Sequence, residues 1–133
     1  DGADLFSTHP KILKVNMESI KLFKNESYDT VTLINTLAYS SRPERVFSEV
    51  SRILKPNGVF VFNFSFHLTK NRLKSNYSND TFPDVSFIDD IFLTKLFKKN
   101  KFHTFFHLPL EKKLLKKGAI IKPTWYGLKK INF

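Results

Sequence analysis

The sequence contains no cysteine, which limits its chemistry at once. Without a thiol the chain has no disulfide, no thiolate nucleophile and no cysteine ligand for zinc. Glycine is also scarce: the four glycines are Gly2, Gly58, Gly118 and Gly127, and none lies in a Gly-rich turn after a predicted strand. Such a turn, at the amino end of a helix, is a common way to hold an anionic nucleotide group.

Long apolar runs are missing as well. No segment approaches the roughly 20 apolar residues that a transmembrane helix requires, and no basic start leads into a hydrophobic stretch as it does in a signal peptide. Together with the lack of cysteine, this pattern predicts a soluble, cytoplasmic protein. The 133 residues, 41% of them hydrophobic, suffice for one compact domain or a large piece of one.

Positive charge dominates, with a formal net charge of +10, and it is unevenly distributed. Residues 1–66 carry eight Lys and Arg against seven Asp and Glu, whereas residues 67–133 carry fourteen against five. A basic half can attract nucleic acid, anionic lipid or an acidic partner. Lys, Asn, Phe and Ile are enriched together, however, as in proteins encoded by AT-rich genomes, and we favour that compositional explanation.

The order of predicted elements is strand, helix, strand, helix, strand, strand. Residues 1–11 show no sustained period and predict a loop. Short apolar runs predict strands ending at Asn16 and at Ile34. Ser41 and Glu44 form a capping box that predicts the start of a helix, which Pro56 ends. The later segments are a turn at residues 57–58, a strand at 59–64, a polar loop at 67–84, a helix beginning at Ser86 or Asp89, a strand at 102–108, a connector at 111–122 and a strand at 124–133.

Apolar spacing assigns the buried faces of these elements. The first helix has one apolar stripe, formed by Val46, Phe47, Val50, Ile53 and Leu54. The strand at residues 59–64 is apolar on both faces, which favours a parallel sheet covered by helices on both sides. For the second helix we predict a buried face of Phe87, Ile88, Ile91, Phe92 and Leu96, with Asn100 as a left-handed cap.

The fold class that follows is α/β, with parallel strands, flanking helices and two consecutive strands at the end. Residues 28–65 carry a resemblance that agrees with this order. They contain YDTV, which is similar to the "FD-x-V" entry to a strand, and EVSRILKPNG, which is similar to "E-x-x-R-V-L-K-P-G-G". Both motifs resemble the C-terminal half of a class I S-adenosylmethionine (SAM)-dependent methyltransferase, of the methyltransferase type 11 or ubiquinone-biosynthesis-methyltransferase kind.

This resemblance implies a Rossmann-like sheet that ends in an antiparallel hairpin, with SAM as the cofactor and a small-molecule or lipid-like acceptor. It implies one partial methyltransferase domain over residues 1–133, with the 67–84 loop over the cleft. The implied cofactor-binding residues are Asn16, Met17, Glu18, Asn35 and Thr36. The implied catalytic candidates are His67, as a base, and Tyr39, beside the acceptor.

The N-terminal part of the family's sequence pattern is not found, since no Gly-rich motif can be assigned. Asp4 is a candidate for the acid that binds the SAM ribose, but it lies only twelve residues before Asn16, which is short for an intervening helix. We therefore expect a missing N-terminal segment or a partner chain to complete the sheet, and expect this fragment alone to be inactive.

Two other functions stay open at this point. One is a non-catalytic, methyltransferase-like module that binds a partner. The other is binding or methylation of RNA through the basic half, where aromatic residues interleave lysines between Phe97 and Phe106. His103 and His107 share a parity that predicts one face of a strand, and we expect them to be packing residues rather than metal ligands.

Overall fold

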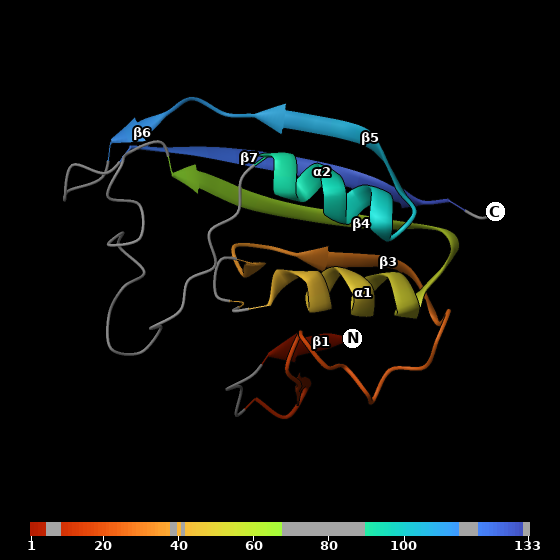
Figure 1. Cartoon of the computed structure of the whole chain (residues 1–133). Helices are drawn as coiled ribbons and strands as arrows, with labels where there is room; N and C mark the ends of the chain where they lie inside the picture. The colour runs from red at the N-terminus through yellow and green to blue at the C-terminus, as the bar shows by residue number, and fades with distance from the viewer. Residues whose placement is uncertain (5–8, 38–39, 41, 68–89, 115–119, 132–133) are drawn as a thin grey trace.

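The computed structural model describes residues 1–4, 9–37, 40, 42–67, 90–114 and 120–131 (Figure 1). The elements are β1 (Gly2–Asp4), β2 (Ile12–Lys14), β3 (Tyr28–Leu33), α1 (Pro43–Ile53), β4 (Leu54–His67), α2 (Asp90–Lys99), β5 (Phe102–Pro109), β6 (Lys113–Leu114) and β7 (Ile120–Lys130). The larger sheet has the order β3-β4-β7-β5, with β6 paired to β7, and β1 and β2 form a separate two-stranded sheet. This mixed α/β architecture confirms the predicted fold class.

The strand directions agree with the prediction. β3 and β4 are parallel, with Val31 opposite Phe60 and Leu33 opposite Phe62. β7 lies between β4 and β5 and runs antiparallel to both, which confirms the antiparallel ending. The carboxyl ends of β3 and β4 therefore meet at one edge of the sheet.

Local sequence explains the limits of α1. Pro43 stands in the first turn, where its missing N–H costs nothing, and the predicted stripe of Val46, Phe47, Val50 and Ile53 is buried. Leu54 leaves the helix in an extended conformation, two residues before Pro56. The positive φ predicted for Asn57 is confirmed at 65°, but the residue lies within β4, at the irregularity between the Tyr28–Leu54 and Thr30–Val59 pairs, and not in a separate turn.

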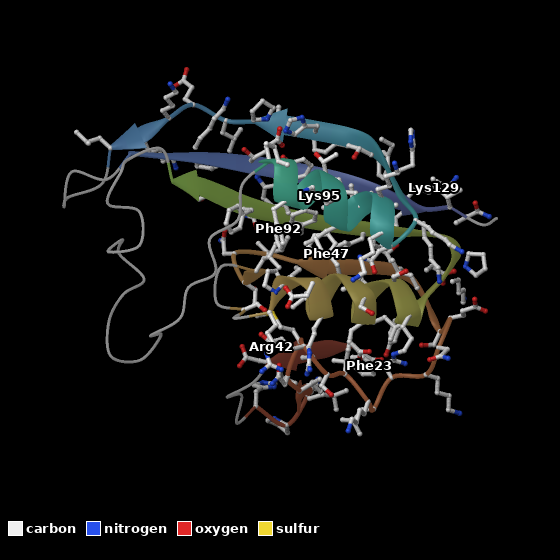
Figure 2. The ribbon with its side chains drawn as sticks, viewed as in Figure 1. Phe23, Arg42, Phe47, Phe92, Lys95 and Lys129 are labelled. Carbon is white, nitrogen blue, oxygen red and sulfur yellow. The ribbon has the colours of Figure 1, made fainter. Side chains whose placement is uncertain are left out.

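The core lies between the helices and one face of the sheet. The Phe47 ring on α1 lies 5.5 Å from Phe60 and 5.4 Å from Phe62 between centroids, and 5.8 Å from Phe97 of α2. Figure 2 shows Phe47 between α1 and α2. Aromatic pairs at these separations add to the free energy of area burial, so Phe47 joins three elements.

The two faces of β4 differ in their cover. Phe60, Phe62 and Phe64 point toward the helices and are buried, whereas Val59 and Val61 on the opposite face are half-buried. Helical cover on both faces, which the sequence predicts, is found on one face only within the described ranges, where α1 and α2 lie together (Figure 1).

The predicted buried face of the second helix is confirmed in part, because Leu96 is buried and Phe92 packs against the core. Ile91 is 69% exposed, and the buried residues of α2 are Leu93, Leu96 and Phe97. Ile91 is therefore the residue predicted wrongly, and Leu93 and Phe97 complete the buried face, with Phe97 in the ring cluster around Phe47. Phe87 and Ile88 lie outside the described residues.

The predicted cap of the second helix is also wrong. Lys101, with a φ of 58°, takes the left-handed conformation that we predicted for Asn100. The Asn100 side chain donates instead to the Leu96 carbonyl at 2.9 Å, and that carbonyl also accepts from the Asn100 backbone N–H at 3.1 Å.

The amino-terminal prediction also needs correction, since β1 is a strand rather than a loop. It pairs in parallel with β2, and the Val15 N–H donates to the Asp4 carbonyl at 3.0 Å. Three residues are too few for a period to be recognised.

Residues 68–84 of the predicted loop lie outside the residues that the structure describes. Among the described residues, no helix is long and apolar enough to cross a membrane.

Candidate functional site

Polar residues follow the carboxyl ends of the parallel strands. Asp4 ends β1, Asn16 follows β2, and Asn35 follows β3. Figure 1 shows the arrows of β1, β3 and β4 pointing the same way. Ligands of open α/β sheets bind outside these ends, so this edge is the candidate site.

Asn16 and Met17 form a tight turn at this edge. The Asn16 side-chain oxygen accepts from the Glu18 N–H at 2.9 Å, and its backbone carbonyl accepts from the Ser19 N–H at 3.0 Å. Asn16 is exposed, while Met17 is half-buried and packs against the core. The side-chain oxygen keeps a second lone pair, and an amide oxygen accepts two hydrogen bonds.

Glu18 joins this turn to the start of α1. One carboxylate oxygen accepts from the Ser40 hydroxyl at 2.6 Å and from the Arg42 N–H at 3.0 Å. The predicted capping box is therefore wrong in its residues: Arg42 is the N-cap and makes no capping hydrogen bond with its side chain, while Ser41 lies outside the described residues. A carboxylate from another segment complements the positive end of the helix dipole instead.

Asn35 and Thr36 occupy a turn directly after β3. Asn35 has a φ of 52°, and its backbone N–H donates to the Asn63 side-chain oxygen at 2.6 Å. The Asn63 amide in turn donates to the Asn35 side-chain oxygen. The Thr36 hydroxyl donates to the Ile34 carbonyl at 2.6 Å. Asn63 was not predicted as a site residue, although a polar residue within an apolar strand was a visible signal.

The two catalytic candidates remain predictions. His67 is the last residue of β4, opposite Ile121 of β7. Its backbone thus reaches the same edge as Asn35, because β3 and β4 are parallel. Tyr39 lies outside the described residues.

The equal parity of His103 and His107 does not put them on one face, and that prediction is wrong. Thr104 pairs with Leu128 and Phe106 with Gly127, so Phe105 is an extra, bulged residue. A bulge shifts the alternation of side chains by one. His103 therefore lies opposite exposed Lys129, whereas His107 stacks on Tyr126 with ring centroids 4.5 Å apart.

Tyr126 forms a polar cluster that sequence reasoning missed. It is buried between Phe62 and Phe97, and its hydroxyl donates to an Asp90 carboxylate oxygen at 3.4 Å. Burial, together with the negative charge of Asp90, raises the pKa of the Tyr126 hydroxyl well above its ordinary value. The hydroxyl is neutral at physiological pH and acts as a hydrogen-bond donor.

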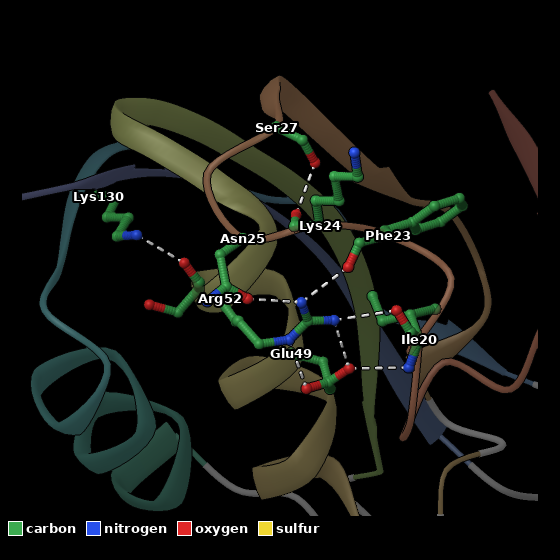
Figure 3. A network of polar contacts seen from close by, with 9 residues as sticks. Ile20, Phe23, Lys24, Asn25, Ser27, Glu49, Arg52 and Lys130 are labelled. Atoms are coloured by element: carbon green, nitrogen blue, oxygen red, sulfur yellow. Dashed lines mark hydrogen bonds and ion pairs between the residues drawn. The ribbon is translucent and has the colours of Figure 1, made fainter.

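Arg52 holds the irregular segment after the Asn16 turn against α1 (Figure 3). Its donors reach the carbonyls of Ile20 and Phe23 at 2.9 and 2.8 Å, the Asn25 side chain at 2.8 Å, and both Glu49 oxygens at 3.0 Å. The hydrogen bond from Arg52 lowers the pKa of the Glu49 carboxyl, and Glu49 raises the pKa of the guanidinium. All five donors of the guanidinium are used.

The aromatic residues of the basic half divide between core and surface. Phe97 and Phe102 are buried in the core, so their spacing among lysines is explained by packing. Phe105 and Phe106 are 57% and 44% exposed on the sheet face away from the helices. A Cβ at Gly127 would lie 2.9 Å from the Phe105 ring, so the ring covers the glycine.

Comparison with known proteins gives one family match. Residues 3–62 match the family described as methyltransferase domain. The matched residues make up somewhat less than half of the chain. The match begins within β1 and ends in β4, so it includes the strand that the sequence analysis missed. A search of curated protein sequences finds no match.

Solved structures share the fold, among them proteins named as methyltransferases. A SAM-dependent methyltransferase from Methanosarcina mazei is 16% identical with a TM-score of 0.65, over 92% of this chain and 67% of that one. The YcgJ protein of Bacillus subtilis is 15% identical with a TM-score of 0.67, over 92% and 71%. Geranyl diphosphate C-methyltransferase from Streptomyces coelicolor, solved with S-adenosyl-L-homocysteine, is 14% identical with a TM-score of 0.69, over 90% and 53%. The chain thus spans only part of the length of each.

Proposed function

We propose that this domain is the carboxyl-terminal part of an enzyme that transfers a methyl group from SAM to a small-molecule or lipid-like acceptor. The observation that carries the proposal is the strand order β3-β4-β7-β5, with β7 antiparallel between two strands that run parallel to β3. An ordinary doubly wound sheet continues with a further crossover helix instead. The methyltransferase family match over residues 3–62 supports the same conclusion.

The donor set along the sheet edge fits the parts of SAM. Asp4, at the end of β1, has a carboxylate suited to the ribose hydroxyls. Asn16 has a remaining lone pair on its side-chain oxygen for the adenine amino group, and the Met17 N–H suits a ring nitrogen. Asn35 and Thr36 would meet the methionine part. Glu18 supports this set indirectly, through its hydrogen bonds to Ser40 and Arg42.

SAM would supply a methyl group on a sulfonium, and the protein's main task is then to hold donor and acceptor in line. We assign Tyr39 to the acceptor side and His67 to the removal of a proton when the acceptor must lose one. Both assignments rest on position at the end of a strand or in the loop after it.

A further strand would complete the sheet beside β3. Within the described residues, β4 is the one strand paired with β3, and β1 and β2 form a ladder of their own. An unpaired edge of this kind accepts a strand. We propose that an N-terminal segment or a partner chain supplies that strand together with the Gly-rich turn for the SAM carboxylate.

Isothermal titration with S-adenosyl-L-homocysteine tests the proposal, using this chain and a version extended upstream. Heat of binding is expected for the longer version, with weaker binding after Asp4→Asn or Asn16→Ala. Asn57→Ala is the matched control, because Asn57 lies at the start of β4, away from the candidate edge. No heat from either version would overturn the proposal and favour a non-catalytic module.

A further inference from the structure

Asn35 and Asn63 join the ends of β3 and β4 by a reciprocal pair of hydrogen bonds. The Asn35 N–H donates to the Asn63 side-chain oxygen at 2.6 Å, and the Asn63 amide nitrogen donates to the Asn35 side-chain oxygen at 2.5 Å. Asn35 has a φ of 52°, a conformation that residues other than glycine adopt with some strain. Such strain persists where neighbouring groups hold the backbone in place.

The pair has one orientation that satisfies both residues. A backbone N–H can only donate, so the Asn63 oxygen must face Asn35. The Asn63 NH₂ then faces the Asn35 side chain, which must turn its oxygen toward it. The Asn35 NH₂ is left as the outward end, and it has no hydrogen-bond partner among the described residues.

We infer that Asn63 is a positioning residue, which holds the turn at Asn35 and orients the Asn35 NH₂ as a donor toward the cofactor carboxylate. The inference rests on the proposed function and adds to it a residue that makes no contact with the cofactor itself. The exposed Asn35 side chain follows β3 at the edge where ligands of such sheets bind. An NH₂ group pairs with an anionic oxygen, whereas an outward carbonyl oxygen would repel it.

Two substitutions at Asn63 separate orientation from charge. In Asn63→Asp the carboxylate still accepts the Asn35 N–H but has no donor, so the Asn35 amide turns over and presents its oxygen. In Asn63→Leu both hydrogen bonds are lost without a change of charge. Asn57→Asp is the matched control, because Asn57 also has a positive φ, of 65°, and lies at the opposite end of β4.

The readout is the affinity for two ligands, measured on the form of the chain that binds in the titration above. S-adenosyl-L-homocysteine has the carboxylate, and 5′-methylthioadenosine lacks it. Both Asn63 variants are expected to weaken the affinity for S-adenosyl-L-homocysteine by about tenfold, which is the contribution of one charge-assisted hydrogen bond. The affinity for 5′-methylthioadenosine should change by less than about twofold, as it does for a substitution away from any contact.

Hydrogen exchange of the Asn35 amide tests the pair without any ligand. The amide is expected to be protected in the wild type and in Asn63→Asp, and to lose protection in Asn63→Leu. Wild-type affinity of Asn63→Leu for S-adenosyl-L-homocysteine, or an equal loss for both ligands, would overturn the inference alone. A wild type that binds neither ligand overturns the proposed function and, with it, the role assigned to the Asn35 amide.

Discussion

Replacing Arg52 with alanine tests how the segment between β2 and β3 is held. The substitution removes every hydrogen bond in Figure 3 that the guanidinium donates. The Ile20 and Phe23 carbonyls lose their partner at Arg52, and Glu49 loses the cation that neutralises it. Glu49 keeps its bond from the Ile20 N–H at 2.8 Å, so part of the contact between the segment and α1 survives.

The magnitude follows from these contacts. The Arg52 side chain is 29% exposed, so values near the low end for hydrogen bonds apply. Two carbonyls that lose a partner cost about 1 kcal/mol each, and the ion pair with Glu49 adds about 0.5–1 kcal/mol. We expect Arg52→Ala to lower the free energy of unfolding by about 2.5–3 kcal/mol. Arg52→Lys should recover under about 1 kcal/mol, because an ammonium lacks the planar fork that reaches separate acceptors.

Urea denaturation measures the free energy of unfolding, and hydrogen exchange of the Ile20 amide reports on the segment itself. The control is Arg45→Ala, since Arg45 is exposed on α1. It should change the free energy by less than about 0.5 kcal/mol. Equal effects of Arg52→Ala and Arg45→Ala would refute the role assigned to this network.

Three further predictions concern acid stability and packing. The folded-state pKa of Glu49 is lowered from 4.5, so its stabilisation is present above about pH 4.5 and is lost as pH falls through the folded value. Urea melts should show this acid loss in the wild type and a smaller one in Glu49→Gln; identical pH profiles would contradict it. Gly127→Ala should destabilise by about 1–3 kcal/mol through the clash with the Phe105 ring. Adding Phe105→Ala to the Gly127→Ala variant should remove most of this loss of unfolding free energy. A loss that persists in the double variant would contradict a clash with the Phe105 ring. Phe47→Ala should cost about 3–5 kcal/mol in thermal or urea unfolding, and a loss below about 1 kcal/mol would contradict its central place in the core.

The elements predicted correctly are those with strong local patterns. The stripe of α1 fixes which of its residues face the core, because four apolar positions agree with a 3.6-residue period. The continuous apolar run in β4 and the positive φ of Asn57 likewise depend on neighbouring residues alone. The pairing of β3 with β4 follows from the order of these elements.

The errors arise where distant contacts decide. The buried face of α2 includes Phe97 because Phe97 reaches Phe47, which no local spacing reveals. The bulge at Phe105 reverses the face of every later residue in β5, and it accompanies a glycine on the neighbouring strand. Glu18 binds groups more than twenty positions away, so its link to Ser40 was not predictable from its own surroundings.

The candidate site was predictable only where it depends on local sequence patterns. Asn16 and Asn35 follow apolar strands, and the rule that ligands bind at carboxyl ends singles them out from the sequence. Asn63 lies within a strand, and its importance depends on the backbone conformation of Asn35 across the ladder. The sequence therefore indicates the edge, and the structure adds the residue that shapes it.

The most direct test of a SAM site at this edge is a titration of the ¹⁵N-labelled protein, in the form that binds, with S-adenosyl-L-homocysteine, followed by amide chemical shifts. The account predicts shifts at Asp4, Asn16, Met17 and Asn35, with none at Asn57. Shifts that gather instead around Phe105 and Trp125, on the sheet face away from the helices, would contradict it.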